Sequence, residues 1–159
     1  MGLSRFIFSI VLLALSLQVF AGNFPIKPDS RLTPGKLCDL PVEYRYPEHI
    51  AYCGRDVETE TKAEIFEDYR RIGFPMSSGS RSDYKIDHYI PLCMGGSNDK
   101  VNLWPQHVSI YKLTDTMESR LCELMKQGKL SQAKAVNYIV TVKNDLSKVT
   151  AVHRALNSL

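Results

Sequence analysis

The chain has 159 residues, of which 44% are hydrophobic and 23% are charged. This composition excludes intrinsic disorder, a collagen-like fibre and a multi-span membrane protein. The length beyond residue 21 is enough for one domain that buries its own core. The net charge of +3 is small, so any affinity for nucleic acid must come from local clusters of basic residues.

Residues 1–21 have the pattern of an export signal. Arg5 supplies a basic start, a mostly apolar run extends from Phe6 to Val19, and Ala21 precedes Gly22 at the expected cleavage junction. The alternative is a membrane anchor, but that needs about 20 apolar residues and this run is shorter. We therefore expect a periplasmic or secreted protein, without stable membrane association once the signal is removed.

Four cysteines, Cys38, Cys53, Cys93 and Cys122, follow the signal. Exported proteins meet an oxidising environment, so two disulfides are expected. Four cysteines allow three pairings. We favour Cys38 with Cys53 and Cys93 with Cys122, because the first pair brackets one local segment. There is no Cys-x-x-Cys pair, which argues against a zinc ribbon or a thioredoxin-like site.

Residues 22–57 are predicted to form an extended, proline-rich arm held by the first disulfide, and residues 58–159 to form the main domain. Five prolines fall between residues 25 and 47, where each opposes helix formation. Apolar residues at helical spacing predict a helix over residues 58–72, with Gly73 as its stop. A loop over residues 73–83 follows, because serine, proline and glycine interrupt the pattern.

Two short runs, residues 84–92 and 101–104, predict a hairpin with a wide glycine-rich loop. Proline is common in the first turn of a helix, so a helix is expected from Pro105 to about Gln127. A final helix is expected over residues 131–149, with its lysines on a solvated face. The predicted fold class is therefore α+β.

The segment over residues 84–107 holds the polar groups that indicate chemistry. Asp87 and His88 end the first strand, and Asn102 and His107 lie near the expected helix start. Such groups could surround one point. Hydrolysis of a phosphodiester needs a set of this kind: a base for the attacking water, and a cation held by oxygen or imidazole ligands.

The run over residues 86–106 reads Ile-Asp-His-Tyr-Ile-Pro-Leu, then Gly-Gly-Ser-Asn-Asp, then Asn-Leu-Trp-Pro-Gln. It resembles the HNH (ββα-metal, His-Me finger) endonucleases, most closely an exported branch with the pattern Asp-His-x-Ile-Pro-Leu-x-x-Gly-Gly-Ser-Asn-Asp-x-x-Asn-Leu-Trp-Pro. The likeness covers roughly the C-terminal half of the chain. It implies a ββα-metal core with additional helices, joined to the disulfide-stapled arm.

The resemblance also implies roles for individual residues. His88 would be the general base, Asp87 would bind or orient one divalent cation, and Asn102 would fix the loop that presents His88. A further metal ligand is expected near the following helix, with His107 as the nearest imidazole and Asn102 as its substitute. The expected cation is Mg²⁺, with Mn²⁺, Ca²⁺, Zn²⁺ and Ni²⁺ as alternatives.

The implied activity is hydrolysis of DNA, or of RNA, by a monomeric secreted endonuclease with little sequence preference. Arg81, Lys85 and Lys100 lie closest in sequence to the site and are candidates to bind phosphates, with solubility as their alternative role. Two other functions stay open: a non-enzymatic module that binds nucleic acid or protein, and a phosphodiesterase for small substrates.

A geometric condition applies to Asp87 and His88. Neighbouring residues of a regular strand face opposite sides, so both can face one phosphate only at a bulge or at a strand end. Taken alone, such a pair is more often a hydrogen-bonded surface pair. The residues over 95–99 are interpreted as turn chemistry, and Trp104 as a core residue.

Overall fold

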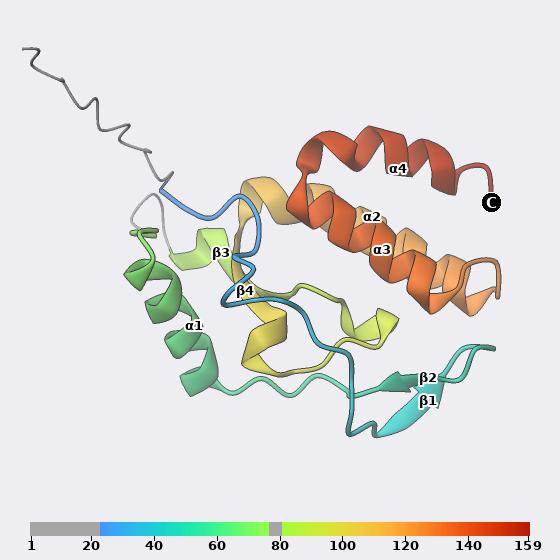
Figure 1. Cartoon of the computed structure of the whole chain (residues 1–159), viewed down its shortest axis with the longest axis horizontal. Helices are drawn as coiled ribbons and strands as arrows, with labels where there is room; N and C mark the ends of the chain where they lie inside the picture. The colour runs from blue at the N-terminus through green and yellow to red at the C-terminus, as the bar shows by residue number, and fades with distance from the viewer. Residues whose placement is uncertain (1–22, 77–80) are drawn as a thin grey trace, which may run out of the picture.

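The computed structural model describes residues 23–76 and 81–159 of the chain. The predicted export signal lies outside these residues. Within them the architecture is α+β, as predicted, with four helices and two small antiparallel sheets (Figure 1). No helix in the described ranges is both long and apolar enough to cross a membrane.

The first sheet is a short ribbon in the N-terminal segment, where the sequence predicted only an extended arm. Strand β1 (Glu43–Arg45) pairs antiparallel with β2 (Ile50–Tyr52). The disulfide between Cys38 and Cys53 closes this segment, with Cα atoms 5.6 Å apart. This confirms the favoured pairing of these two cysteines. We call residues 38–55 the stapled ribbon.

Helix α1 (Thr59–Arg71) confirms the helix predicted over residues 58–72. Its buried face carries Ile65 and Tyr69, and it packs against the second sheet. Gly73 follows with a φ of 101°, a left-handed backbone that glycine adopts without strain and that ends the helix.

The second sheet is the predicted hairpin. Strand β3 (Tyr84–His88) pairs antiparallel with β4 (Leu103–His107). Because β4 continues to His107, Pro105 lies within a strand, and the expected helix start at this proline was wrong. A two-stranded sheet leaves one edge of each strand unpaired, where a residue without a backbone N–H loses no hydrogen bond.

Helix α2 (Val108–Lys126) follows the hairpin directly, and α3 (Gln132–Asn144) returns alongside it (Figure 1). The helix expected over residues 131–149 is shorter, because α3 ends at Asn144. A short 3₁₀ turn over residues 146–148 follows and leads into α4 (Val149–Leu156). The side chain of Asp145 accepts from the Ser147 backbone N–H at 3.0 Å. This local bond competes with the helical pattern and interrupts it.

Two apolar cores lie on either side of the hairpin. One joins α2, α3 and α4, and Leu121 and Ile139 are fully buried in it. The other joins α1 to the hairpin and includes Trp104, which is fully buried as predicted. The predicted disulfide between Cys93 and Cys122 ties the loop after β3 to α2. The end of β3 is thereby held where the two cores meet.

Candidate functional site

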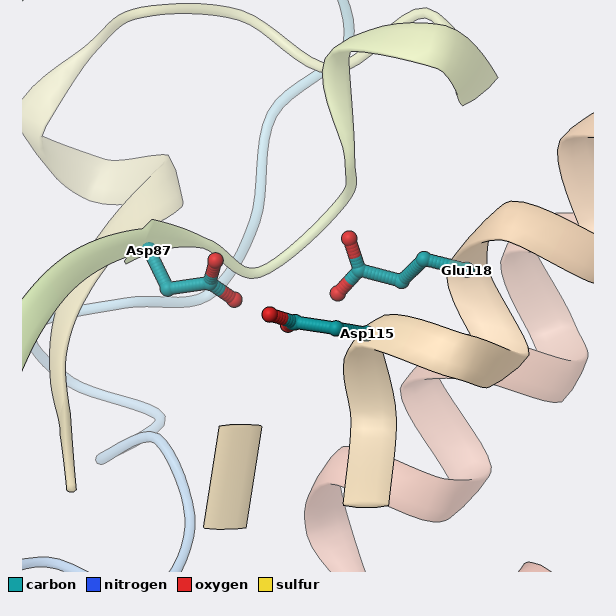
Figure 2. A group of neighbouring side chains, drawn as sticks. All are labelled: Asp87, Asp115 and Glu118. Atoms are coloured by element: carbon teal, nitrogen blue, oxygen red, sulfur yellow. The ribbon is translucent and has the colours of Figure 1, made fainter. Parts of the chain in front are cut away.

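Three carboxylates meet where the end of β3 faces α2. Asp87 comes from β3, and Asp115 and Glu118 lie three residues apart on one face of α2. Figure 2 shows the three side chains pointing toward one another, and their ligand oxygens lie within 4.8 Å of one another. Carboxylate oxygens are the ligands that Mg²⁺ and Ca²⁺ prefer in proteins.

Two lysine ammonium groups share this carboxylate cluster. Nζ of Lys143 lies 2.7 Å from both Asp87 Oδ2 and Glu118 Oε1. Nζ of Lys85 lies 2.6 Å from Asp115 Oδ1 and 3.2 Å from Asp87 Oδ1. Three carboxylates therefore share two ammonium groups, and the cluster keeps one net negative charge when all five groups are ionised.

Lys143 is fully buried, although the sequence placed the lysines of this helix on a solvated face. Its ammonium group also donates to the carbonyl oxygen of His88 at 2.5 Å. With Asp87 and Glu118, this gives each of its three protons an oxygen within reach. The carboxylates hold the ammonium inside the protein, because a buried charge is tolerated only when it is paired.

Burial and these ion pairs together move the pKa values of Asp87 and Glu118 in opposite directions. Burial alone would raise the pKa of Asp87, but the charges of Lys143 and Lys85 outweigh it and hold that pKa below its ordinary value. Burial raises the pKa of Glu118, and Lys143 offsets only part of this effect. A cation at the cluster would find Asp87 ionised and would favour ionisation of Glu118.

His88 lies beside the cluster and is only 4% exposed. Its Nε2 is 3.0 Å from Oδ1 of Asn98, while Nδ2 of Asn98 donates to the carbonyl oxygen of Gly54 at 2.8 Å. Because the Gly54 carbonyl needs a donor, the NH₂ group of the Asn98 amide faces it, and the amide oxygen faces the His88 ring. An amide oxygen only accepts hydrogen bonds. Nε2 of His88 therefore carries the proton, and the neutral ring has its lone pair on Nδ1.

The surroundings of His88 favour the neutral ring. Burial lowers the pKa of His88 below its ordinary value, and the hydrogen bond that the ring donates to Asn98 opposes this only in part. The positive charge of Arg55 lowers the same pKa further. A neutral imidazole is the state that a general base needs.

Asp87 and His88 line a single hollow of about 190 Å³. Strand pairing reaches His88 and stops there, so the two neighbours meet at a strand end, which is the geometry that the sequence analysis required. The rest of the wall is formed by Arg55, Pro91, Leu92, Cys93 and Glu118.

Asn102 is fully buried and holds the loop that follows β3. Its Nδ2 donates to the carbonyl oxygens of Ile90 and Ser97, both at 2.9 Å. Its Oδ1 accepts from the backbone N–H groups of Ile90 at 2.9 Å and Lys36 at 3.4 Å. Both atoms of the amide are thus engaged by backbone, and Asn102 offers no free atom as the substitute metal ligand.

The loop closes so tightly on itself that glycine is required at position 96. A Cβ added to Gly96 would lie 1.8 Å from the carbonyl oxygen of Ile90 and 2.9 Å from Nδ2 of Asn102. Gly96 therefore does more than form a turn, because the absence of a side chain there lets the Asn102 amide reach the backbone on both sides of the loop.

His107 lies away from the site, which corrects its prediction as a metal ligand. It pairs with Tyr84, whereas Asp87 pairs with Trp104, so His107 is three residues, or about 10 Å, along the ladder from Asp87. Its ring stacks on Phe24 with centroids 3.9 Å apart. The prediction failed because β4 extends to residue 107, where the sequence analysis expected a helix.

Comparisons with protein-family models, curated proteins and solved structures find no match to this chain. The likeness to HNH endonucleases accordingly rests on the run over residues 86–106. The function that it implies is a proposal, supported by the geometry of the hollow.

Of the three predicted phosphate-binding residues, Lys85 and Lys100 do not line the hollow. Lys85 is held by the carboxylate cluster, and Lys100 pairs with Glu64 at 3.0 Å and Asp68 at 2.7 Å on α1. Arg81 begins the short 3₁₀ turn before β3, and its side chain lies outside the part that the structure describes. The basic side chain that does line the hollow is Arg55.

Sequence reasoning missed four residues of the site. Asp115 and Glu118 carried a usable signal, since two acids three residues apart on a helix share one face. Lys143 carried none, because its partner Asp87 lies 56 residues away. Asn98 lies in the run over residues 95–99 that was interpreted as turn chemistry, and the sequence does not show its contacts with His88 and Gly54.

Proposed function

We propose that the protein is a secreted, metal-dependent endonuclease that hydrolyses phosphodiester bonds of DNA, or of RNA, on an HNH-like ββα-metal core. The proposal is carried by one observation: a buried histidine whose Nε2 faces an amide oxygen lines the same hollow as Asp87 and Glu118, two members of the carboxylate cluster. Phosphodiester hydrolysis needs a base and a concentrated positive charge near the phosphate. The histidine supplies the first, and the cluster can hold the second.

The donor chemistry of the cluster fits a hard divalent cation. Asp87, Asp115 and Glu118 offer carboxylate oxygens only, and an oxygen that accepts from an ammonium group keeps a second lone pair for a metal. This set suits Mg²⁺, Mn²⁺ or Ca²⁺ better than Zn²⁺ or Ni²⁺, which favour imidazole or thiolate ligands. A bound cation would supply the positive charge that stabilises the crowded phosphate.

The chain's own groups then have distinct tasks. Nδ1 of His88 takes a proton from the attacking water, while Asn98 keeps the other ring proton on Nε2. Asn102 holds the loop after β3 and thereby the position of His88. The two lysines keep Asp87 ionised, so that its carboxylate is ready to bind a cation at neutral pH.

One observation favours the non-enzymatic alternative, a module that uses this fold only for binding. Lys85 and Lys143 already pair with all three carboxylates, and a structural ion-pair network would need no metal. That alternative gives no reason for His88 to line the hollow with Nδ1 unprotonated. We therefore prefer the enzyme.

The test is cleavage of supercoiled plasmid by the purified mature protein. We expect relaxed and linear products with Mg²⁺ or Mn²⁺ and none with excess chelator. A chromogenic phosphodiester assayed in parallel identifies a small-substrate enzyme, which would cut it faster than DNA. Intact plasmid and RNA with every divalent cation would refute the nuclease, and cleavage that survives the chelator would refute its metal dependence.

A further inference from the structure

Arg55 is the cationic side chain that the structure leaves open at the hollow. It is exposed and lines the same wall as Asp87 and His88. Lys85, in contrast, is tied to two carboxylates, whereas Arg55 forms no ion pair with any described residue. Its guanidinium is therefore available to an anion that enters the hollow.

The stapled ribbon holds Arg55 in place. Cys53, two residues earlier, is bonded to Cys38, and Gly54 turns the chain with a φ of 66°. The Gly54 carbonyl accepts from Asn98, the residue that also binds the His88 ring. The orientation of the base and the position of residue 55 thus depend on one short piece of backbone.

The ribbon is also joined to the glycine-rich loop from its other side. The Cys38 N–H donates to the Gly95 carbonyl at 2.8 Å, and the Ser97 N–H donates to the Lys36 carbonyl at 3.0 Å. Both ends of the segment closed by the disulfide therefore contact the loop that presents His88. These hydrogen bonds hold the stapled ribbon against the loop, and Arg55 lines the hollow as part of that ribbon.

We propose that Arg55 binds the scissile phosphate, which makes the stapled ribbon part of the active site. The inference rests on the proposed function and names the group that grips its substrate. A guanidinium can give two parallel hydrogen bonds to phosphate oxygens and keeps its charge at every accessible pH. As His88 takes the proton of the attacking water, negative charge grows on those oxygens and the contact strengthens.

The experiment compares Arg55→Ala and Arg55→Lys with Lys129→Ala. Lys129 is exposed in the turn between α2 and α3, so its removal lowers the net charge equally without touching the hollow. We expect Arg55→Ala to lower kcat about 100-fold to 1,000-fold, the range found for loss of one transition-state donor. Arg55→Lys should recover part of the loss, and Lys129→Ala should stay within twofold of the wild type.

A second measurement separates this inference from the proposed function. Fluorescence anisotropy with a labelled DNA duplex, in chelator, reports binding without cleavage. We expect Arg55→Ala to bind about tenfold more weakly, as for loss of one charge-assisted hydrogen bond. Circular dichroism checks the fold of each variant, and the mass of the intact protein checks that both disulfides are formed.

Each outcome has one meaning. Loss of rate and affinity in Arg55→Ala, but not in Lys129→Ala, supports the phosphate site. Equal rates and equal affinities in these two variants overturn it. If the wild-type protein cuts nothing, the proposed nuclease fails, and the binding comparison alone decides for or against Arg55.

Discussion

The two ends of the β3–β4 hairpin each carry a histidine, and their surroundings differ. At one end His88 is buried, hydrogen-bonded to Asn98 and adjacent to the carboxylate of Asp87. At the other end His107 is partly exposed and stacks on Phe24. Its Nδ1 lies 2.8 Å from the hydroxyl oxygen of Ser109. The same ladder thus presents one ring to charged groups and the other to an aromatic side chain.

The difference comes from the elements that pack at each end. The His88 end meets α2, which contributes carboxylates, and α3, which contributes a buried ammonium group. It also meets the stapled ribbon, whose Gly54 carbonyl binds the Asn98 amide. The His107 end meets α1 and the start of the described chain, and a hollow of about 240 Å³ nearby is lined by Phe66, Met76 and Tyr84. Tertiary neighbours, rather than position in the hairpin, make a histidine a candidate for catalysis.

Removing each ring in turn tests whether the two histidines differ in function as they differ in surroundings. We expect His88→Ala to lower kcat about 100-fold to 10,000-fold, the usual contribution of a general base. His107→Ala should leave kcat within twofold, because its ring reaches neither the carboxylates nor the hollow. Plasmid cleavage at saturating Mg²⁺ measures both, and thermal unfolding checks that each variant is folded.

The control in that experiment is internal, since both variants lose one imidazole from the same hairpin. A His88→Ala protein that cuts as fast as the wild type would exclude His88 as the general base. A large loss in His107→Ala, with an unchanged melting temperature, would transfer the chemistry to the opposite end of the hairpin.

The next largest effect concerns the carboxylates that only the His88 end possesses. Glu118→Gln removes one candidate ligand, and Glu123→Gln removes the same charge from an exposed position on the same helix. We expect Glu118→Gln to bind Mn²⁺ at least about tenfold more weakly, since even groups that merely support metal ligands contribute that much. Titration calorimetry measures the affinity.

Glu123→Gln should bind Mn²⁺ as the wild type does. Wild-type affinity in Glu118→Gln would show that the carboxylates and lysines form a structural ion-pair network. Loss of binding in both variants would point to general electrostatic attraction by α2 rather than to a defined site.

The parts of this fold that depend on local pattern could be predicted from the sequence. Such patterns involve residues that lie close together in the chain. They gave the helix before Gly73, the two strands of the hairpin, and the pairing of Cys38 with Cys53. Trp104 was predicted to be a core residue because it lies between Leu103 and Pro105, and it is fully buried.

The parts that failed depend on where an element stops and on what packs against it. Pro105 matches a helix start as well as an edge strand, and the ladder has three more pairs than predicted, which places His107 away from the site. Lys143 lies in an amphipathic helix, where a lysine is expected to face solvent. It is buried because Asp87 on β3 and Glu118 on α2 pair with its ammonium group. Such long-range pairings leave no periodic signal in the sequence.

The smallest predicted effect is on the acid limb of the pH–rate profile. His88 acts as a base only when neutral, so the rate falls as pH drops through its pKa. Burial, together with the charges of Arg55 and Lys143, lowers that pKa, and it does so against the opposing influence of Asn98 and Asp87. The acid limb of kcat/KM should therefore lie below about pH 6.5, the ordinary value for histidine.

Arg55→Ala tests the assignment of the acid limb to His88, because the variant lacks one of the charges that lower the His88 pKa. The acid limb of this variant should move toward higher pH, by less than the displacement that burial causes, since burial is the larger cause. Lys129→Ala should leave the limb in place. The profiles are measured at Mg²⁺ concentrations that saturate each variant at every pH. A wild-type limb at or above about pH 6.5 would mean that the group titrating in the rate is not a buried His88.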